Sequence, residues 1–141
     1  MGVGGSIAVA AVFVWLGMVL GISFLEAPLK FRAPGVTLAL GLGIGRLVFR
    51  ALNICEAILT AIALAGLWGS GPVLAPLLVA VLTLALQVVA VRPVLTRRSD
   101  AVLAGKEMPR SRAHYAYVGL EAVKVIALVT TGVVVLTHGS I

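Results

Sequence analysis

The sequence is poor in charged residues, poor in aromatic residues and nearly free of cysteine. Charged side chains make up 11% of its 141 residues and aromatic side chains 6%, whereas hydrophobic residues make up 61%. A soluble domain of this length cannot bury that much apolar surface, so the composition excludes a soluble globular protein. The single cysteine, Cys55, excludes an intramolecular disulfide and a CxxC redox pair, and with them the disulfide-exchanging membrane enzymes. We expect Cys55 to be a small apolar residue inside a helix.

Metal-ligand clusters, nucleophile elbows and phosphate-binding loops are also missing from the sequence. Its two histidines, His114 and His138, lie at opposite ends of the last apolar stretch. At ~1.5 Å per helical residue they would be roughly 36 Å apart, so they cannot both bind one haem iron. Local motifs therefore predict no catalytic residue, no metal and no cofactor.

Long hydrophobic runs occupy most of the chain. A bilayer core about 30 Å thick is crossed by ~20 apolar residues of helix. Four runs are long enough, at approximately residues 6–26, 40–67, 72–91 and 114–137. The first has no basic segment before it and exceeds the ~7–15 apolar residues of a signal peptide, so we expect a membrane helix there. The sequence predicts an all-α fold, an integral membrane four-helix bundle that forms one membrane domain over residues 1–141.

The distribution of Lys and Arg indicates the orientation of this bundle. Basic residues are concentrated in two connecting segments, 26–35 and 92–113, whereas the turn at 66–72 and both ends of the chain carry no charge. Because basic loops stay on the cytoplasmic side, we expect both segments inside and both termini outside, in the plasma (bacterial inner) membrane. The net charge of +6 then indicates topology and contact with membrane lipids, not nucleic-acid binding. The basic residues of the two segments are Lys30, Arg32, Arg92, Arg97, Arg98, Lys106, Arg110 and Arg112.

Prolines and glycines indicate where the helices begin and end. Pro72 is tolerated in the first turn of the third helix. Arg92-Pro93 should end that helix, because proline disfavours helix at the residue before it. The glycine-rich run at 35–45 leaves the start of the second helix open. That run is either helix from about residue 40, or an irregular or interfacial segment with regular helix only near Arg46.

Two pairs of glycines have the spacing of a helix–helix contact. Gly17 with Gly21, and Gly41 with Gly45, are four residues apart, so each pair lies on one helix face. Small residues at this spacing allow another helix to approach closely. The approaching helix belongs either to the same chain, or to a second copy or a partner membrane subunit, and the sequence leaves both alternatives open.

Polar residues inside the apolar runs form stripes at helical spacing. The second and fourth runs each carry a stripe, and the third contributes Gln87. Ionisable groups in a membrane core cost several kcal/mol unless they are paired or face a wet cavity, so the stripes should face the bundle interior. The candidate ligand-binding residues are Arg46, Arg50, Asn53, Glu56, Gln87, His114, Tyr117, Glu121 and Lys124.

The depth of these residues predicts which of them meet. Glu56 lies ten residues from Arg46, and Lys124 lies ten residues from His114, at the cytoplasmic ends of their stripes. If the second and fourth helices are neighbours, opposite charges pair at matched depths, and a low-dielectric interior requires such neutrality. The predicted pairs are Glu56 with Lys124, Glu121 with Arg50, and Glu26 with Arg46. We therefore expect a charge-balanced polar crevice that is open to the cytoplasm and closed toward the outside by the apolar halves of the helices.

Three short passages carry a resemblance that covers nearly the whole chain. They are Trp15-Leu16-Gly17-Met18 leading into Ser23-Phe24 and Phe31, the Arg92-Pro93 exit into a basic loop, and His114 with polar residues three and seven positions later. Together they resemble a four-helix membrane family of unassigned function that includes transmembrane protein 205. In that family the position three residues after the His is typically Ser and the position seven residues after it is typically Asn. Here these positions are Tyr117 and Glu121. The resemblance implies a four-helix membrane fold and no established reaction.

A more local resemblance rests on residues 46–56, Arg-Leu-Val-Phe-Arg-Ala-Leu-Asn-Ile-Cys-Glu. This segment is similar to the second-helix signature of the membrane-associated proteins of eicosanoid and glutathione metabolism (MAPEG). Asn53 and Glu56 match that pattern, and Arg50 lies one residue closer to the Asn than the pattern has it. The third helix of that family has a tyrosine-rich ending, and here Val91-Arg92-Pro93 stands in its place. The resemblance implies that Arg46, Arg50, Asn53 and Glu56 hold glutathione at a trimer interface.

The sequence leaves three functions open. The first is binding or transport of a small polar or amphipathic molecule in the crevice, with Arg46 and Arg50 attracting an anionic group and Glu56 acting with Lys124 as a gate. The second is a glutathione-dependent membrane transferase. The third is a non-catalytic subunit or assembly factor that docks through its glycine faces. A network of ion pairs that only holds the helices in register is the structural alternative to a binding site.

Overall fold

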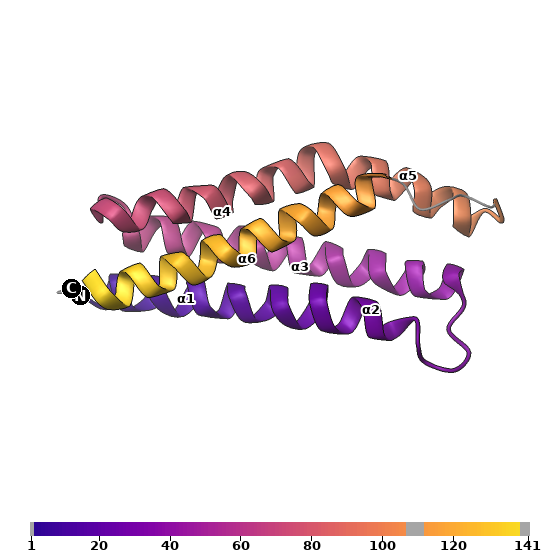
Figure 1. The fold of residues 1–141 in the computed structure, drawn as a ribbon, viewed down its shortest axis with the longest axis horizontal. Coiled ribbons are helices and arrows are strands. Elements are labelled where there is room, and N and C mark those ends of the chain that lie inside the picture. Colours follow the sequence, from indigo (N-terminus) through magenta and orange to yellow (C-terminus); the bar gives the residue numbers. More distant parts are fainter. Residues whose placement is uncertain (1, 107–111, 139–141) are drawn as a thin grey trace.

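The computed structural model describes residues 2–106 and 112–138, and these residues form helices joined by short turns without any strand (Figure 1). Arg110, one of the basic residues expected in the last connection, lies outside the described residues. Two of the segments, η1 and η3, are π-helical turns, and η2 is a 3₁₀ turn. The elements are α1 (Val3–Val19), η1 (Leu20–Glu26), α2 (Ala27–Lys30), α3 (Leu38–Leu67), η2 (Gly71–Val73), α4 (Leu74–Leu86), η3 (Gln87–Val91), α5 (Arg92–Leu103) and α6 (Arg112–His138).

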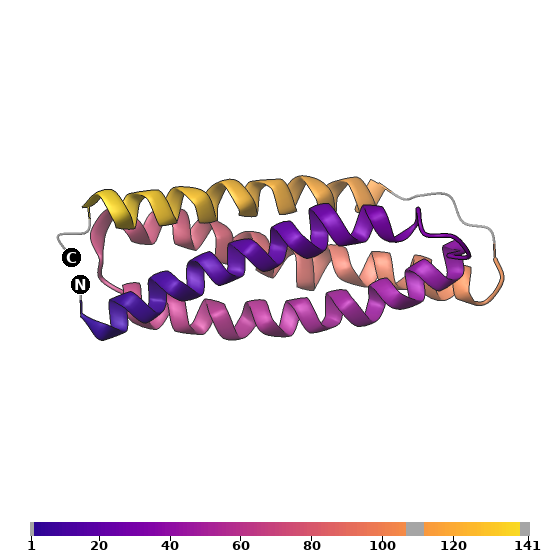
Figure 2. The same cartoon turned by 90° about the horizontal axis from the view of Figure 1, so that it is seen from below.

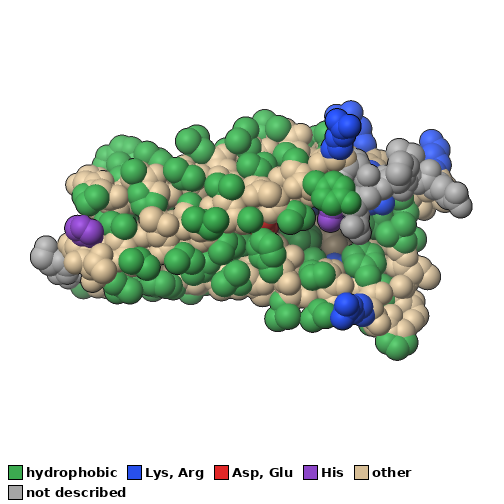
Figure 3. Space-filling view, viewed as in Figure 1, with side chains coloured by type: hydrophobic (Ala, Val, Ile, Leu, Met, Phe, Trp, Pro, Cys, Tyr) green, Lys and Arg blue, Asp and Glu red, His purple; other side chains and the backbone are tan. Residues whose placement is uncertain are grey.

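Consecutive elements join into four long helices, and each of them is long and apolar enough to cross a membrane. Their bounds are Val3–Lys30, Leu38–Leu67, Gly71–Leu103 and Arg112–His138. The prediction of an all-helical bundle of four apolar helices is confirmed at this level. Large apolar side chains such as Leu47, Val89 and Leu136 are exposed. Figure 3 shows hydrophobic side chains spread along the face in view.

The helices pack in a ring in which α3 and α6 are diagonal partners. The principal packed pairs are α1 with α3, α1 with α6, and α4 with α6. Figure 2 shows α3 and α6 at opposite edges, with α1 crossing between them. The expectation that the second and fourth helices are neighbours is therefore wrong, and side chains from these two helices can meet only across the bundle axis.

The two ends of the bundle differ in composition. The start of α1 and the end of α6 lie together at one end, which we call the terminal half (Figure 1). The α2–α3 connection and the end of α5 lie at the other, which we call the basic half because Lys and Arg side chains gather there (Figure 3). The termini thus lie opposite the basic connections, as the predicted topology requires.

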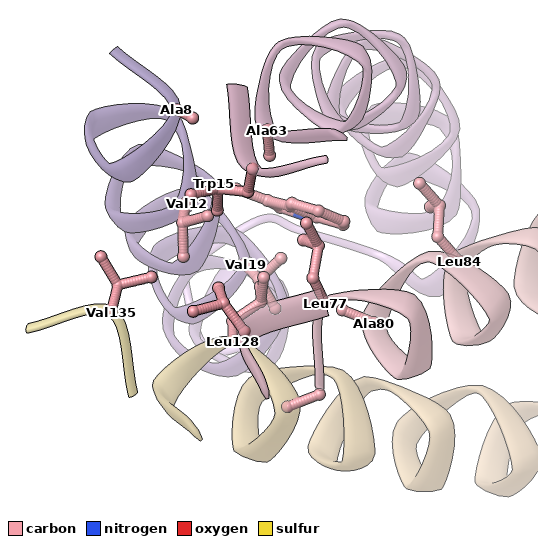
Figure 4. Close-up of a cluster of buried hydrophobic side chains, with 13 residues drawn as sticks. Ala8, Val12, Trp15, Val19, Ala63, Leu77, Ala80, Leu84, Leu128 and Val135 are labelled. Atoms are coloured by element: carbon pink, nitrogen blue, oxygen red, sulfur yellow. The ribbon is translucent and has the colours of Figure 1, made fainter. Parts of the chain in front are cut away.

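An apolar core fills the terminal half. Trp15 is fully buried and lies among side chains from α3, α4 and α6, including Ala63, Leu77 and Leu128 (Figure 4). Gly66 lets α1 approach α3 closely, because a Cβ there would meet the carbonyl oxygen of Gly4 at 2.6 Å. The buried side chains of this half are mainly hydrophobic, although Thr131 of α6 is also 0% exposed and donates to the Ala127 carbonyl oxygen.

The glycine pairs expected at helix contacts behave differently from each other. A Cβ at Gly17 or Gly21 would have nothing within 4 Å, so this pair does not lie at a contact within the chain. A Cβ at Gly41 would collide with the Phe31 ring, so that glycine serves packing within the chain. Docking of a partner through Gly17 and Gly21 stays a prediction.

Two predicted helix ends are wrong, and the start of the second helix, which the sequence left open, is now defined. The second helix is regular from Leu38, because the Thr37 hydroxyl caps it by accepting a hydrogen bond from the Leu40 N–H at 3.1 Å. The first helix continues past Pro28 to Lys30, and the third continues past Pro93 to Leu103. A π-turn lies immediately before each proline segment. The wider π-turn relieves the clash of the proline ring with the preceding carbonyl, so the helix can continue.

Candidate functional site

Three ionisable side chains meet at the centre of the bundle. The Lys124 ammonium lies 2.6 Å from Glu56 Oε2 and 2.6 Å from Glu121 Oε1. The side chains of Lys124 and Glu56 are 0% exposed and that of Glu121 is 1% exposed. Glu121 precedes Lys124 by three residues on α6, so both project to the same face. The predicted Glu56–Lys124 pair is confirmed, and it bridges the diagonal between α3 and α6.

The first and third helices complete the hydrogen bonds of the two carboxylates. Trp15 donates its indole N–H to Glu56 Oε2 at 2.7 Å, and Ser23 donates to Glu121 Oε2 at 2.5 Å. The Gln87 amide donates to Glu121 Oε1 at 3.1 Å and to the Tyr117 carbonyl oxygen at 3.3 Å. Sequence analysis missed Trp15 as a site residue, although a buried indole N–H requires an acceptor. We call Trp15, Ser23, Glu56, Gln87, Glu121 and Lys124 the central cluster.

A second group of side chains connects the central cluster to the basic half. The Asn53 amide, in the orientation that satisfies both neighbours, donates to Glu56 Oε1 at 3.2 Å and accepts from Arg92 at 3.3 Å. Arg92 also donates to the Tyr117 hydroxyl at 3.0 Å. Its guanidinium lies 5.2 Å from the Phe49 ring centroid and 4.9 Å from that of Tyr117, within cation–π range. Sequence analysis assigned Arg92 to the loop, because it ended the helix there.

The charge balance of the interior differs from the prediction. Glu56 and Glu121 are balanced by Lys124 and by the half-buried Arg92, which acts on the cluster through Asn53 and Tyr117. With the Glu26–Lys30 pair, in which the Lys30 side chain is 7% exposed, the interior has the predicted three carboxylates and three cations, but Lys30 and Arg92 take the places of Arg46 and Arg50. A neutral arrangement in which opposite charges balance each other keeps the cost of burial low.

Arg46 and Arg50 do not enter this arrangement, and two predicted pairs are wrong. Arg46 pairs with Asp100 of α5 at 2.7 Å, and Arg50 is exposed on α3. Glu26, expected to pair with Arg46, lies 3.5 Å from Lys30. Arg50 and Glu56 are six residues apart, which at ~100° per residue separates them by roughly 120° around the helix. The inward face of α3 is centred on Glu56, so Arg50 is turned outward.

His114, the remaining candidate, lies near the start of α6. Its half-buried ring packs edge-on against the Tyr115 ring, with the centroids 5.7 Å apart. It is one turn of helix from Tyr117 on the basic side of the central cluster. This position corresponds to the rim of the predicted crevice, not to its centre.

The bundle opens beside the central cluster in the basic half. α1 packs closely against α6, whereas η1 and α2, which continue the same helix, make much less contact with it. Figure 3 shows this face hollowed near the basic end, with an acidic side chain visible in the recess. The apolar core of the terminal half closes the other side. Glu56, Glu121 and Lys124 are themselves only 0–1% exposed, so a crevice that reaches the central cluster stays a prediction.

Several buried polar atoms of the basic half make no hydrogen bond within the described part of the chain. Among them are the Gln87 Oε1 and Glu26 Oε2 acceptors and the Arg92 Nε donor. A buried polar group without a partner costs about 1–3 kcal/mol, so such atoms bond to water or to a ligand. Gln87 is 0% exposed and also contacts Glu121, which places one of these acceptors at the central cluster.

No protein-family model, curated protein or solved structure matches this chain. The described residues also contain no group of three or more His, Cys, Asp or Glu that could hold a metal ion. The interpretation of the site therefore rests on its own geometry, and the two family resemblances stay predictions.

Proposed function

We propose that this chain is a four-helix integral membrane protein with both basic connections in the cytoplasm and both termini outside. The four apolar helices and the gathering of Lys and Arg at one end support this topology. The exposed apolar side chains around the bundle are then in contact with lipid. The plasma (bacterial inner) membrane is the proposed location.

We further propose that the crevice binds, and in doing so transports or senses, a small amphipathic molecule that enters from the cytoplasmic half. The observation that carries this proposal is the full burial of Lys124 between Glu56 and Glu121. Apolar residues of similar size often replace such a network at no cost to stability, so stability alone does not account for it. Ionisable groups within a membrane bundle mark substrate and proton pathways.

The chemistry of the unpartnered atoms indicates the polar group of this molecule. Glu26 Oε2 and Gln87 Oε1 are both acceptors, and Glu121 already accepts from Ser23 and Gln87. Because Arg92 Nε is an unpartnered donor, a ligand group that both donates and accepts, such as a hydroxyl, complements the whole set. Exposed apolar side chains of η1, such as Phe24, suit the apolar part of the molecule.

Native mass spectrometry of the protein released from its own lipid membrane tests this proposal. We expect a discrete bound molecule, distinct from bulk phospholipid, on the parent protein and its loss in Glu56→Gln. The Gln side chain keeps an acceptor for Trp15, and the Lys124–Glu121 pair stays intact, so this variant should fold. Arg97→Gln, a change at an exposed charge on α5, is the matched control and should keep the molecule. Bare parent protein, or an adduct retained in Glu56→Gln, contradicts the proposal.

A docking function has one observation in its favour. Gly17 and Gly21 face open space, so a helix of a second copy or of a partner membrane subunit could approach there. Gly17→Leu would block that approach without a clash inside the chain. Loss of a stoichiometric partner from native membranes in this variant supports the subunit function, and unchanged co-purification removes it.

The glutathione-dependent function has no such support in the geometry. It requires Arg46, Arg50, Asn53 and Glu56 to converge on one ligand at a surface between subunits. Arg46 is tied to Asp100 and Arg50 is exposed, whereas Glu56 lies 0% exposed at the centre of a single chain. Conjugation of glutathione to an apolar electrophile by the purified protein would restore this hypothesis.

A further inference from the structure

Two of the long helices contain the same local irregularity. In each, a π-turn is followed within two residues by a proline: Pro28 follows η1, which ends at Glu26, and Pro93 follows η3, which ends at Val91. A proline has no N–H to donate to the preceding turn, and π-turns interrupt the regular hydrogen-bond ladder. Bending at these two positions therefore costs less than bending elsewhere in the same helices.

Side chains of both π-turns donate hydrogen bonds to the same carboxylate, that of Glu121. Ser23 lies in η1 and Gln87 lies in η3, and both donate to Glu121, from opposite sides of α6 in the ring of helices. The two irregular segments are thus placed at the depth of the central cluster. A π-turn that presents a functional side chain is the usual reason for retaining one.

The basic ends of the two helices differ in how they are held. α5 is tied to α3 by the Arg46–Asp100 pair at 2.7 Å and by the stacking of Arg92 on Phe49. Beyond Val19, the first helix makes much less contact with α6, and the Ser23–Glu121 hydrogen bond connects η1 to that helix. This hydrogen bond is therefore the main restraint between the η1–α2 segment and α6, whereas the packing of Phe31 on Gly41 holds the end of the segment to α3.

We propose that the basic end of the first helix is a hinged lid on the crevice, with the π-turn η1 as the hinge and the Ser23–Glu121 hydrogen bond as the latch. The lid rests on the proposed function, since it controls access to the same crevice. A donor group of the ligand takes the place of the Ser23 hydroxyl on Glu121, so the bound state keeps the latch open. Short hinges at element ends that absorb domain closure are a common device in binding proteins.

Distances between spin labels in lipid nanodiscs, measured without any ligand, test the lid. In a Cys55→Ala background, labels at Leu29→Cys on α2 and Tyr115→Cys on α6 report the lid, and both positions are exposed. Labels at Val14→Cys and Val133→Cys, also exposed, report the terminal half of the same two helices. We expect Ser23→Ala to lengthen the Leu29–Tyr115 distance by roughly 5 Å, about one helical turn, and to leave the Val14–Val133 distance unchanged. Ser23→Thr keeps a hydroxyl and should retain the parent distance.

An unchanged Leu29–Tyr115 distance in Ser23→Ala overturns the lid, and so does an equal change at both pairs, which would indicate general loosening. The result is independent of the binding test. A lengthened lid distance together with bare protein in native mass spectrometry keeps the lid and removes the binding function. A bound molecule together with an unmoved lid keeps the function and removes the hinge.

Discussion

The terminal and basic halves of this bundle use the same helices in opposite ways. In the terminal half, small residues bring α1 close to α3, and apolar side chains pack around the Trp15 ring, whose N–H reaches Glu56. In the basic half, the first helix makes less contact with α6, both π-turns occur, and the interior contains the charges and most of the unpartnered polar atoms. One half has the features of a closed, rigid support, and the other has those of a site. The difference supports the proposal that the terminal half serves packing and the basic half contains the site.

The largest effect should come from removing the ammonium that the two buried carboxylates share. Lys124→Met leaves Glu56 and Glu121 facing each other at the bundle centre with 0% and 1% exposure. Breaking a buried pair in this way costs about 3–5 kcal/mol. Unfolding of the purified protein in mixed micelles with increasing SDS measures the loss. The double variant Lys124→Met with Glu56→Gln should recover part of it, because one uncompensated charge is removed. If Lys124→Met alone were as stable as the parent, the stability of the bundle would not depend on charge balance at its centre.

Two glycine-to-alanine substitutions should change stability in opposite directions. At Gly66 in the terminal half, the added Cβ meets the Gly4 carbonyl oxygen at 2.6 Å, and overpacking of this kind costs about 1–3 kcal/mol. At Gly119 of α6, on the basic side of Lys124, nothing lies within 4 Å, so Gly119→Ala should stabilise by roughly 0.5–1 kcal/mol through helix propensity. The same SDS unfolding measures both variants. If both variants changed the free energy of unfolding in the same direction and by the same amount, the contrast between closely packed Gly66 and open Gly119 would be contradicted.

The sequence predicted the four-helix architecture more accurately than it predicted the contacts between side chains. Four apolar runs and a one-sided distribution of Lys and Arg are sufficient for the bundle, because a bilayer demands length and hydrophobicity from each helix separately. The Glu56–Lys124 pair was also predictable, since depth along two helices is a count of residues. The order of the helices in the bundle and the rotation of each helix about its axis cannot be obtained by counting residues, because both depend on tertiary packing.

The wrong site predictions follow from this limit. Arg50 shares a stripe with Asn53, but the packing of α1 against α3 turns the inward face toward Glu56, and only tertiary contacts decide that rotation. Asp100 and Arg92 were missed because Pro93 was expected to end the helix, whereas the π-turn before it lets the helix continue. A proline in an apolar run thus indicates either an end or a hinge, and the sequence alone does not separate the two.

A smaller effect is expected from the link between the central cluster and the basic rim. Tyr117→Phe removes the hydroxyl that accepts from Arg92 at 3.0 Å but keeps the ring on which the guanidinium stacks. The loss of one such hydrogen bond should cost about 1 kcal/mol. Tyr115→Phe is the matched control, because that side chain is 64% exposed, and it should leave the unfolding free energy unchanged. Equal stability of the two variants would show that Arg92 balances the interior without Tyr117.

The smallest effect should come from the Arg46–Asp100 pair that joins α3 to α5 at the rim. Its atoms lie 2.7 Å apart, yet the two side chains are 41% and 58% exposed, so water and salt screen the interaction. A double-mutant cycle with Arg46→Gln and Asp100→Asn should give a coupling of less than ~1 kcal/mol that decreases further at high ionic strength. The Glu56–Lys124 pair has the same type of groups at nearly the same distance, 2.6 Å, but no exposure. Burial, and not geometry, then accounts for the difference between a pair that fastens the rim and one that defines the site. A salt-independent coupling of several kcal/mol at Arg46–Asp100 would place the rim within the site and erase that distinction.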